Sequence, residues 1–327
     1  MRKTITAIAL VSLILTGCSA TSSSYDSQSP LCGPAESNAA VEKIQATGDF
    51  DTKPTVTIAA PISSKTIATK VLSEGTGKKY YGNQLVRFEY TALNATTGAT
   101  FSSSKYDGTD SITQEFDKGQ QIDFCKALGG VREGSRVAIL IPATMAHKNQ
   151  GDVANNVGAN DDVVFVLDLL KVYYNKAIGT SWIHQDGAPT LLTAANGQPS
   201  VQIPKSAAPT ETKLYLTVKS SESQAVALGD TITLQYSGFL WSDGKVFDSS
   251  WTSGQPVTWT LSQDGFIKGF VRALTESRDG QPAHVGDQIM AVIPPGEAYG
   301  NEAKTGIPAG STLVFVIDVL GTENPKK

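Results

Sequence analysis

The most informative part of the sequence is a discontinuous motif in its C-terminal half: residues 236–238 (YSG), 244–250 (GKVFDSS), 298–300 (AYG), 307–308 (IP) and 313–315 (LVF). Strand signals surround this motif. Within residues 231–237, Ile232, Leu234 and Tyr236 alternate with polar residues, the period-two pattern of a half-buried strand. Residues 288–293 and 312–319 are further β-rich runs, and residues 242–244 (SDG) predict a turn.

One short helix is predicted among these strands. Phe266, Phe270, Ala273 and Leu274 recur at helical spacing and form a single apolar stripe. Strands on both sides of one helix favour an antiparallel β-sheet wrapped around a short α-helix. The sequence therefore predicts the α+β fold class.

The order and spacing of the motif resemble those of the FKBP-type peptidyl-prolyl cis-trans isomerases. The resemblance implies an apolar hollow for a substrate proline between the concave face of the sheet and the helix. It assigns catalytic positions to Tyr236, Phe247, Asp248, Tyr299 and Phe315, and substrate-binding positions to Val257, Phe266, Ile267, Phe270 and Ile307. It implies no metal and no cofactor.

The resemblance also implies a role for each polar group of the hollow. The backbone amide of Ile307 and the hydroxyl of Tyr299 would hold carbonyl groups of the substrate, and Asp248 would orient the hydroxyl of Tyr236. Two positions depart from the family pattern: Phe270 stands where many members have Trp, and Val257 where an aromatic residue is common. Both departures indicate a slightly wider or shallower pocket.

The motif has a second, eroded copy upstream. Tyr90 and Phe101 precede Tyr236 and Phe247 by 146 positions, and residues 164–168 (VFVLD) precede residues 314–318 (VFVID) by 150. A nearly constant offset indicates two tandem domains. We expect an FKBP-like domain at residues 48–173, a linker at 174–197, an FKBP-type domain at 198–322 and a tail at 323–327.

The first copy lacks several polar elements of the second. Ser102 stands in place of Asp248, and residues 145–147 (MAH) replace the AYG triplet. The stretch 149–162, rich in Asn and Asp, has no Ile-Pro pair. These losses predict that domain one is weak or inactive as an isomerase and acts as a spacer or a binding module.

The N-terminus is typical of a targeting segment. Arg2 and Lys3 precede an apolar run, residues 5–15, and residues 15–18 (LTGC) resemble a bacterial lipobox. The resemblance implies a signal peptide at residues 1–17, lipid on Cys18 and a protein anchored outside the cytoplasmic membrane. The alternative is an ordinary cleavage site with an accidental cysteine. Residues 20–30 are Ser-rich and polar, which predicts a flexible tether at 18–47.

Two further cysteines, Cys32 and Cys125, either pair as a disulfide or remain free thiols; we hypothesise that they pair, pinning the end of the tether against domain one. The three histidines, His147, His184 and His284, are too scattered for a metal site. A net charge of -4 argues against nucleic acid as a partner.

Two function classes follow from the sequence. The first is an extracytoplasmic prolyl isomerase whose partners are proline-containing segments of secreted or surface proteins, with domain two as the catalyst. The second is a non-catalytic lipoprotein chaperone or adhesion module that binds extended chains in the same hollow. An intact Asp248 and Tyr299 favour the first class.

Overall fold

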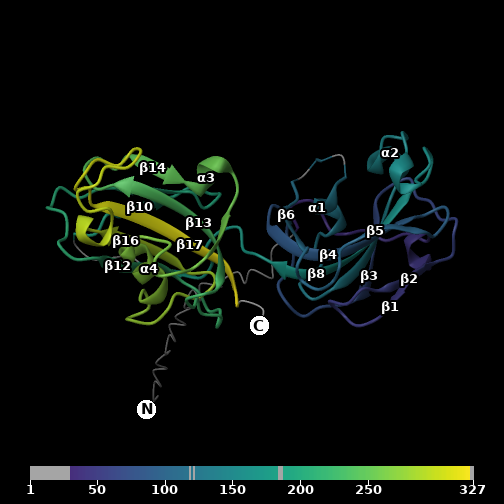
Figure 1. The fold of residues 1–327 in the computed structure, drawn as a ribbon, viewed down its shortest axis with the longest axis horizontal. Coiled ribbons are helices and arrows are strands. Elements are labelled where there is room, and N and C mark those ends of the chain that lie inside the picture. The colour runs from purple at the N-terminus through teal and green to yellow at the C-terminus, as the bar shows by residue number, and fades with distance from the viewer. Residues whose placement is uncertain (1–29, 118, 121, 183–186, 325–327) are drawn as a thin grey trace, which may run out of the picture.

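The computed structural model describes residues 30–117, 119–120, 122–182 and 187–324. Two α+β domains lie next to each other along the long axis of the molecule (Figure 1). This arrangement confirms the predicted fold class of tandem domains, each with antiparallel strands and few helices. Within the described ranges, no helix has the length and apolar character needed to cross a membrane.

Domain one is a six-stranded antiparallel sheet with strand order β3-β7-β8-β4-β5, in which β6 also pairs with β4. Its elements are β3 (Ala68–Ser73), β4 (Leu85–Asn94), β5 (Thr100–Ser103), β6 (Ile112–Glu115), α1 (Phe124–Ala127), β7 (Arg136–Ile141), α2 (Ala143–Ala146), η3 (Val153–Asn155) and β8 (Val163–Val172). The short helix α1 covers the concave face of the sheet and contributes Phe124 to the core beneath it.

Domain two repeats this plan with strand order β14-β13-β17-β16-β12-β9, in which β15 also pairs with β13. Its elements are β9 (Thr180–Ser181), β12 (Lys213–Lys219), β13 (Thr231–Leu240), β14 (Val246–Ser249), α3 (Ser250–Ser253), β15 (Val257–Thr260), α4 (Lys268–Thr275), β16 (Gln288–Ile293), η4 (Pro295–Glu297) and β17 (Leu313–Glu323). The strands and the helix predicted from periodicity are all present, with β13 and β17 longer than expected.

The register of the strands confirms the duplication. Tyr90 pairs with Leu167 across β4 and β8, and Tyr236 pairs with Ile317 across β13 and β17. A β-bulge follows Arg87 in one pair and Thr233, 146 positions later, in the other. Because a bulge re-aims the side chains beyond it, matching bulges keep equivalent residues on the same face.

A hairpin covers the outer face of each sheet; it precedes β3 in domain one and lies between β9 and β12 in domain two. In domain one the hairpin is β1 (Ile44–Thr47) with β2 (Thr55–Ile58), preceded by η2 (Val41–Lys43); in domain two it is β10 (Thr190–Thr193) with β11 (Pro199–Gln202). Val41 and Ile44 are fully buried against domain one, and Leu191 packs against the outer core of domain two.

These hairpins correct two expected boundaries. Residues 41–47, expected in the tether, belong to domain one because their apolar side chains complete its outer core. Much of the expected linker, 174–197, belongs to domain two, where β9 extends the sheet and β10 forms half of a hairpin. The signal peptide, Cys18 and the first part of the tether lie outside the described residues.

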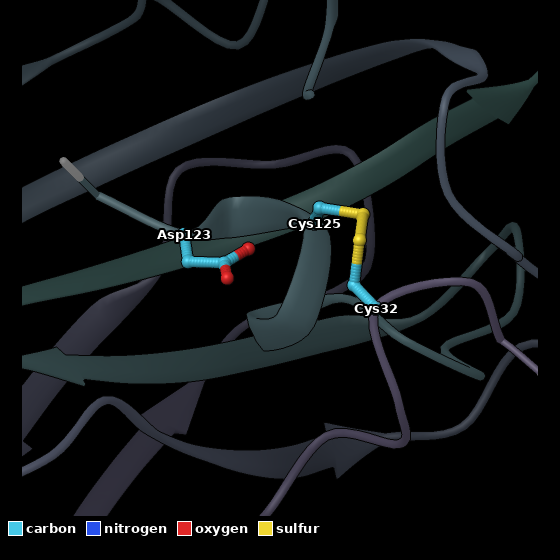
Figure 2. Close-up of side chains that lie close together, drawn as sticks. All are labelled: Cys32, Asp123 and Cys125. Atoms are coloured by element: carbon cyan, nitrogen blue, oxygen red, sulfur yellow. A yellow bond between two sulfur atoms is a disulfide. The ribbon is translucent and has the colours of Figure 1, made fainter. Parts of the chain in front are cut away.

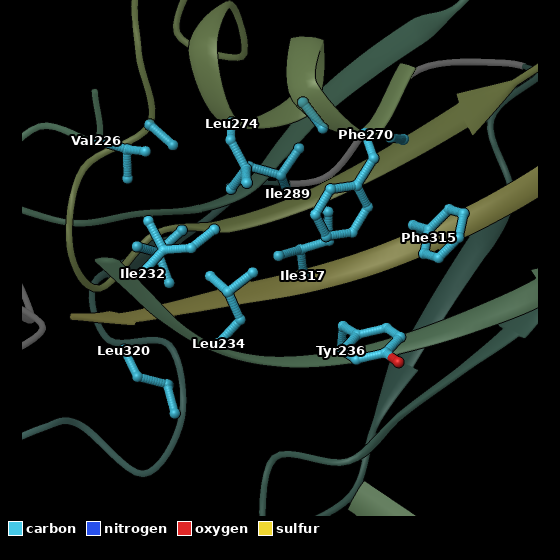
Figure 3. Close-up of a cluster of buried hydrophobic side chains, with 14 of the residues drawn as sticks. Val226, Ile232, Leu234, Tyr236, Phe270, Leu274, Ile289, Phe315, Ile317 and Leu320 are labelled. Atoms are coloured by element: carbon cyan, nitrogen blue, oxygen red, sulfur yellow. The ribbon is translucent and has the colours of Figure 1, made fainter. Parts of the chain in front are cut away.

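The main core of domain two lies between the sheet and α4 (Figure 3). One end of this core is aliphatic, with Ile232, Leu234 and Leu274. The other end is aromatic, where Phe270 descends from the helix toward Tyr236 on β13 and Phe315 on β17. The sheet and the helix thus diverge over aromatic side chains, where a pocket can open.

Cys32 and Cys125 form a disulfide that ties the segment before the first hairpin to α1 (Figure 2). Asp123 lies beside this disulfide, and its carboxylate accepts a hydrogen bond from the backbone amide of Lys126 at the start of the helix. A metal needs thiolate ligands from cysteine, and here the two sulfur atoms are bonded to each other. The cluster is therefore a covalent anchor for α1.

Candidate functional site: an aromatic pocket in domain two

A pocket of about 490 Å³ opens at the aromatic end of the domain two core. Its residues come from β13, β14, β15, the loop before α4, α4 itself, the loop after η4 and β17. They are Tyr236, Phe247, Asp248, Trp259, Asp264, Gly265, Phe266, Ile267, Lys268, Phe270, Ala298, Tyr299 and Phe315. The volume lies within the range of small-ligand sites.

Tyr236 stands at the centre of the aromatic wall. Its ring centroid lies 5.5 Å from that of Trp259, 6.5 Å from that of Phe270 and 6.4 Å from that of Phe315. Phe266 stacks on Phe270 at a centroid distance of 5.4 Å and an interplanar angle of 14°. Rings that contact one another in this way form rigid walls that exclude water from any group placed between them.

Gly238 allows one ring of the pocket to lie directly against the sheet. A Cβ atom at this position would lie 2.4 Å from Cζ of Phe247, a distance that no side chain tolerates. The ring of Phe247 thereby reaches Phe315, with an edge-to-face contact of 5.6 Å between centroids. A glycine in β13 thus sets the width of the pocket.

A hydroxyl and a carboxylate meet at the mouth of the pocket. The Tyr236 hydroxyl donates a short hydrogen bond to Oδ2 of Asp248. Burial raises the pKa of Tyr236 above its ordinary value, and the hydrogen bond to Asp248 raises this pKa further. Tyr236 therefore remains a neutral donor, while the exposed carboxylate of Asp248 places a negative charge beside an apolar cavity.

Tyr299 lies half-buried on the opposite rim, in the loop after η4. The ammonium group of Lys304 lies 5.7 Å from the centroid of its ring and also pairs with Glu302. This cation–π contact positions the ring at the pocket entrance.

The structure brings eight of the ten expected site residues into the pocket, all except Val257 and Ile307. Val257 and Ile307 pack against the core behind the pocket. The amide of Ile307 donates to the carbonyl of Lys304 at 2.9 Å, so this donor is already engaged. The carbonyl-holding role expected for this amide requires the turn at residues 304–307 to open.

Trp259 is a pocket residue that the sequence analysis did not assign to the site. It lies two residues after Val257 on β15, and alternate residues of a strand share a face. Its ring contacts both Tyr236 and Phe266. Trp259 therefore supplies the aromatic ring that is missing at position 257. The period-two pattern of residues 257–260 is the sequence signal that places these two residues on one face of the strand.

Domain one has a pocket at the equivalent place, with a volume of about 660 Å³. Tyr90, Phe101, Phe124 and Phe165 line it, as their counterparts line the pocket of domain two. Here the Tyr90 hydroxyl lies 2.9 Å from the hydroxyl of Ser102, so the carboxylate is absent from this contact. The first copy of the motif has therefore lost the carboxylate of this contact but still forms a cavity.

The sequence matches the family model of the FKBP-type peptidyl-prolyl cis-trans isomerases at residues 77–170 and again at 222–320. These two matches cover more than half of the chain. The chain therefore belongs to the FKBP-type peptidyl-prolyl cis-trans isomerase family.

Individual relatives match over one domain length. The FKBP-type peptidyl-prolyl cis-trans isomerase FkpA of Escherichia coli (strain K12) is 37% identical over 114 residues, which cover 35% of this chain and 39% of FkpA. FK506-binding protein 1A of Neurospora crassa is 37% identical over 100 residues, which cover 30% of this chain and 78% of that protein. The chain thus spans about two fifths of the length of FkpA.

Proposed function

We propose that this protein is a peptidyl-prolyl cis-trans isomerase and that catalysis takes place mainly in domain two. The observation that carries the proposal is the contact between Tyr236 and Asp248 at the mouth of a pocket walled by aromatic rings. The substrates are proline-containing segments of other polypeptides.

The chemistry requires no nucleophile. Rotation about an amide bond costs ~18–20 kcal/mol because resonance must be lost, and the prolyl bond relaxes uncatalysed over tens to hundreds of seconds. A dry pocket with fixed polar groups favours the twisted amide over both planar forms, because the twisted form no longer depends on water to stabilise a polarised carbonyl. An acceleration of about a thousandfold needs only about 4 kcal/mol of such differential binding.

Each group of pocket residues has a different role in this catalysis. Phe247, Phe270 and Phe315 enclose the prolyl ring and the adjacent carbonyl, and they exclude water. The carboxylate of Asp248 stabilises the partial positive charge on the carbonyl carbon, which grows as resonance is lost. The Tyr299 hydroxyl, on the opposite rim, donates to a neighbouring carbonyl of the substrate.

A protease-coupled assay with a chromogenic proline tetrapeptide tests the proposal on the full chain. The wild type should accelerate isomerisation well above the background rate, and Asp248→Ala and Phe315→Ala should each lower kcat/KM. Circular dichroism of both variants controls for folding. A wild-type rate equal to background would end the proposal.

In that event the alternative function, a non-catalytic binding module, takes its place. One observation favours this alternative: the Ile307 amide is engaged with Lys304 and is not free for a substrate carbonyl. Binding of an unlabelled proline peptide to the wild type, measured by quenching of Trp259 fluorescence in the absence of turnover, would identify it.

We further propose that the protein is a lipoprotein anchored outside the cytoplasmic membrane through Cys18, acting on secreted or surface proteins. The support is the lipobox-like sequence LTGC and the disulfide between Cys32 and Cys125, since disulfides persist in oxidising compartments. Metabolic labelling with tritiated palmitate should mark the wild type and leave Cys18→Ala unlabelled. Label on the variant, or none on the wild type, would contradict the anchor.

A further inference from the structure

The pocket of domain one is chemically distinct from that of domain two. Among the residues that the structure describes, every one that lines it is uncharged, and its polar atoms are hydroxyls and amides: Tyr90, Ser102, Gln114, Gln120 and Asn155. The pocket of domain two, in contrast, is lined by Asp248, Asp264 and Lys268. A larger neutral cavity with hydroxyl and amide groups suits an apolar or aromatic segment of a polypeptide better than a charged ligand.

This pocket has lost the groups that would act on a prolyl bond. Ala146, in the MAH triplet that replaces AYG, stands in place of Tyr299 and carries no hydroxyl. Ser102 takes the place of Asp248 in the contact with the tyrosine. The cavity can still bury side chains, with Phe124 5.8 Å from Phe165 and 4.9 Å from Phe116 between ring centroids.

Several contacts hold the two domains together. Glu323, at the end of β17, pairs with Arg87 of β4 at 2.5 Å and accepts a short hydrogen bond from the Tyr173 hydroxyl. The Tyr174 hydroxyl donates to Glu222 at 2.5 Å. Leu85, Tyr173 and Tyr174 are buried in the core cluster of domain two. These contacts fix one pocket relative to the other.

One more interaction crosses between the domains close to the first pocket. Burial raises the pKa of Glu115 on β6, and a nearby side chain of domain two, Gln255, opposes this shift. Gln255 lies four residues before Trp259 in the loop that leads into β15. Because Glu115 lies between the pocket residues Gln114 and Phe116, the first pocket adjoins the side of domain two that carries the loop into β15.

We propose that the pocket of domain one is a non-catalytic holding site for an uncharged apolar or aromatic segment of the same polypeptide whose proline occupies domain two. The inference rests on the proposed function of domain two. Binding at the first pocket raises the effective concentration of nearby prolines at the second, so long unfolded chains are favoured over short peptides.

Two variants of the full chain test this site. Ser102→Trp fills the cavity, and Gln114→Glu places a charge at its mouth with almost no change in shape. The probe is reduced, carboxamidomethylated α-lactalbumin, a permanently unfolded chain, and its Kd is measured by fluorescence anisotropy. Losing one buried apolar contact should raise this Kd about tenfold in Ser102→Trp, with a smaller rise in Gln114→Glu.

The matched controls are Thr100→Trp, on the same strand as Ser102, and Thr113→Glu, next to Gln114. Both residues are exposed and neither lines the pocket. The controls should bind the unfolded chain like the wild type, and all four variants should keep the wild-type kcat/KM on the tetrapeptide.

The outcomes separate the two proposals. Absence of tetrapeptide turnover in the wild type contradicts the proposed function. Normal turnover with an unchanged Kd in Ser102→Trp and Gln114→Glu overturns the holding site. A dimer of the wild type that dissociates in these variants, seen by analytical ultracentrifugation, would assign the pocket to a second copy of the chain and also overturn it.

Discussion

Each of the two domains has a buried aspartate at the equivalent point of its sheet, but the partners of the two aspartates differ. Asp168 is paired with the guanidinium of Arg136, with Nε to Oδ1 at 2.6 Å. Asp318 instead receives hydrogen bonds of 2.8 Å from the Gln288 amide and the backbone amide of Ala177. The duplication has kept the backbone and the apolar core, while the buried polar partners have diverged.

The two pockets likewise differ through small side-chain changes on a common backbone. Ala92 in domain one and Gly238 in domain two occupy equivalent positions, and only the glycine admits the ring of Phe247 against the sheet. The methyl group of Ala92 excludes this placement for Phe101, which is consistent with the larger cavity of domain one. Differences of one methyl or one carboxyl group thus distinguish the volume and the charge of two related pockets.

The largest expected effect comes from breaking the ion pair of domain one. Arg136→Met would leave Asp168 buried without its cation and remove hydrogen bonds to the carbonyls of Gly48, Asp49 and Thr52. We expect a loss of about 3–5 kcal/mol in the free energy of unfolding. Urea denaturation, with hydrogen exchange to localise the loss to domain one, measures it.

The matched change in domain two is Gln288→Met, which removes hydrogen bonds to Asp318 and Thr217 and breaks no ion pair. Its expected cost is about 1–2 kcal/mol. Equal losses in the two variants would show that the charge of the Arg136 pair contributes nothing beyond an ordinary hydrogen bond.

The next effect is a dependence of stability on pH. Complete burial raises the pKa of Asp318 from its ordinary value of 3.8 to about 6. Between these values the native state binds more protons than the unfolded state, so stability falls as pH rises from about 4 to about 6, by about 3 kcal/mol, and is then constant. Urea denaturation across this range, in wild type and Asp318→Asn, measures the contribution as a difference.

The Asn variant cannot ionise, so its curve should lack this component, and the wild type should gain relative to it as pH is lowered toward 4. Parallel curves for the two proteins would mean that Asp318 has an ordinary pKa in the native state.

A third prediction exchanges the residue that distinguishes the two pocket mouths. Asp248→Ser should lower kcat/KM on a proline tetrapeptide about 10- to 100-fold, because a charge-assisted hydrogen bond and the charge at the reacting carbonyl are both lost. Ser102→Asp should leave the rate unchanged, since domain one also lacks a counterpart of the Tyr299 hydroxyl.

The protease-coupled assay on the full chain resolves both effects. A clear gain in Ser102→Asp would show that the carboxylate alone restores catalysis to domain one, and that the missing tyrosine is dispensable.

The smallest expected effect concerns the width of the pocket. Gly238→Ala should push the ring of Phe247 away from Phe315 and lower kcat/KM about fivefold, a change of about 1 kcal/mol in transition-state binding. Ala92→Gly, at the matched position of domain one, should leave the rate unchanged. An unaffected rate in Gly238→Ala would mean that the position of Phe247 does not limit catalysis.

Much of the site could be predicted because its signals are local in the sequence. The strand containing Tyr236, the helix containing Phe270 and the strand containing Phe315 each show their own periodicity. Trp259 was missed because a wall position was expected at residue 257, and only the pairing of β15 with β13 decides which residue of that strand reaches Tyr236. The hairpin boundaries were misplaced because short exposed strands carry a weak pattern.

The two-fold repeat, the fold class and the family could be read from the sequence alone, because these depend on apolar periodicity and on the order of residues along the chain. The folded structure was needed to show that Cys32 and Cys125 pair, which hydrogen-bond donors are engaged, and that the pocket of domain one is still open. The physical reason is that pairing, desolvation and cavity volume arise between residues far apart in the chain. Local propensity cannot encode the distance between them.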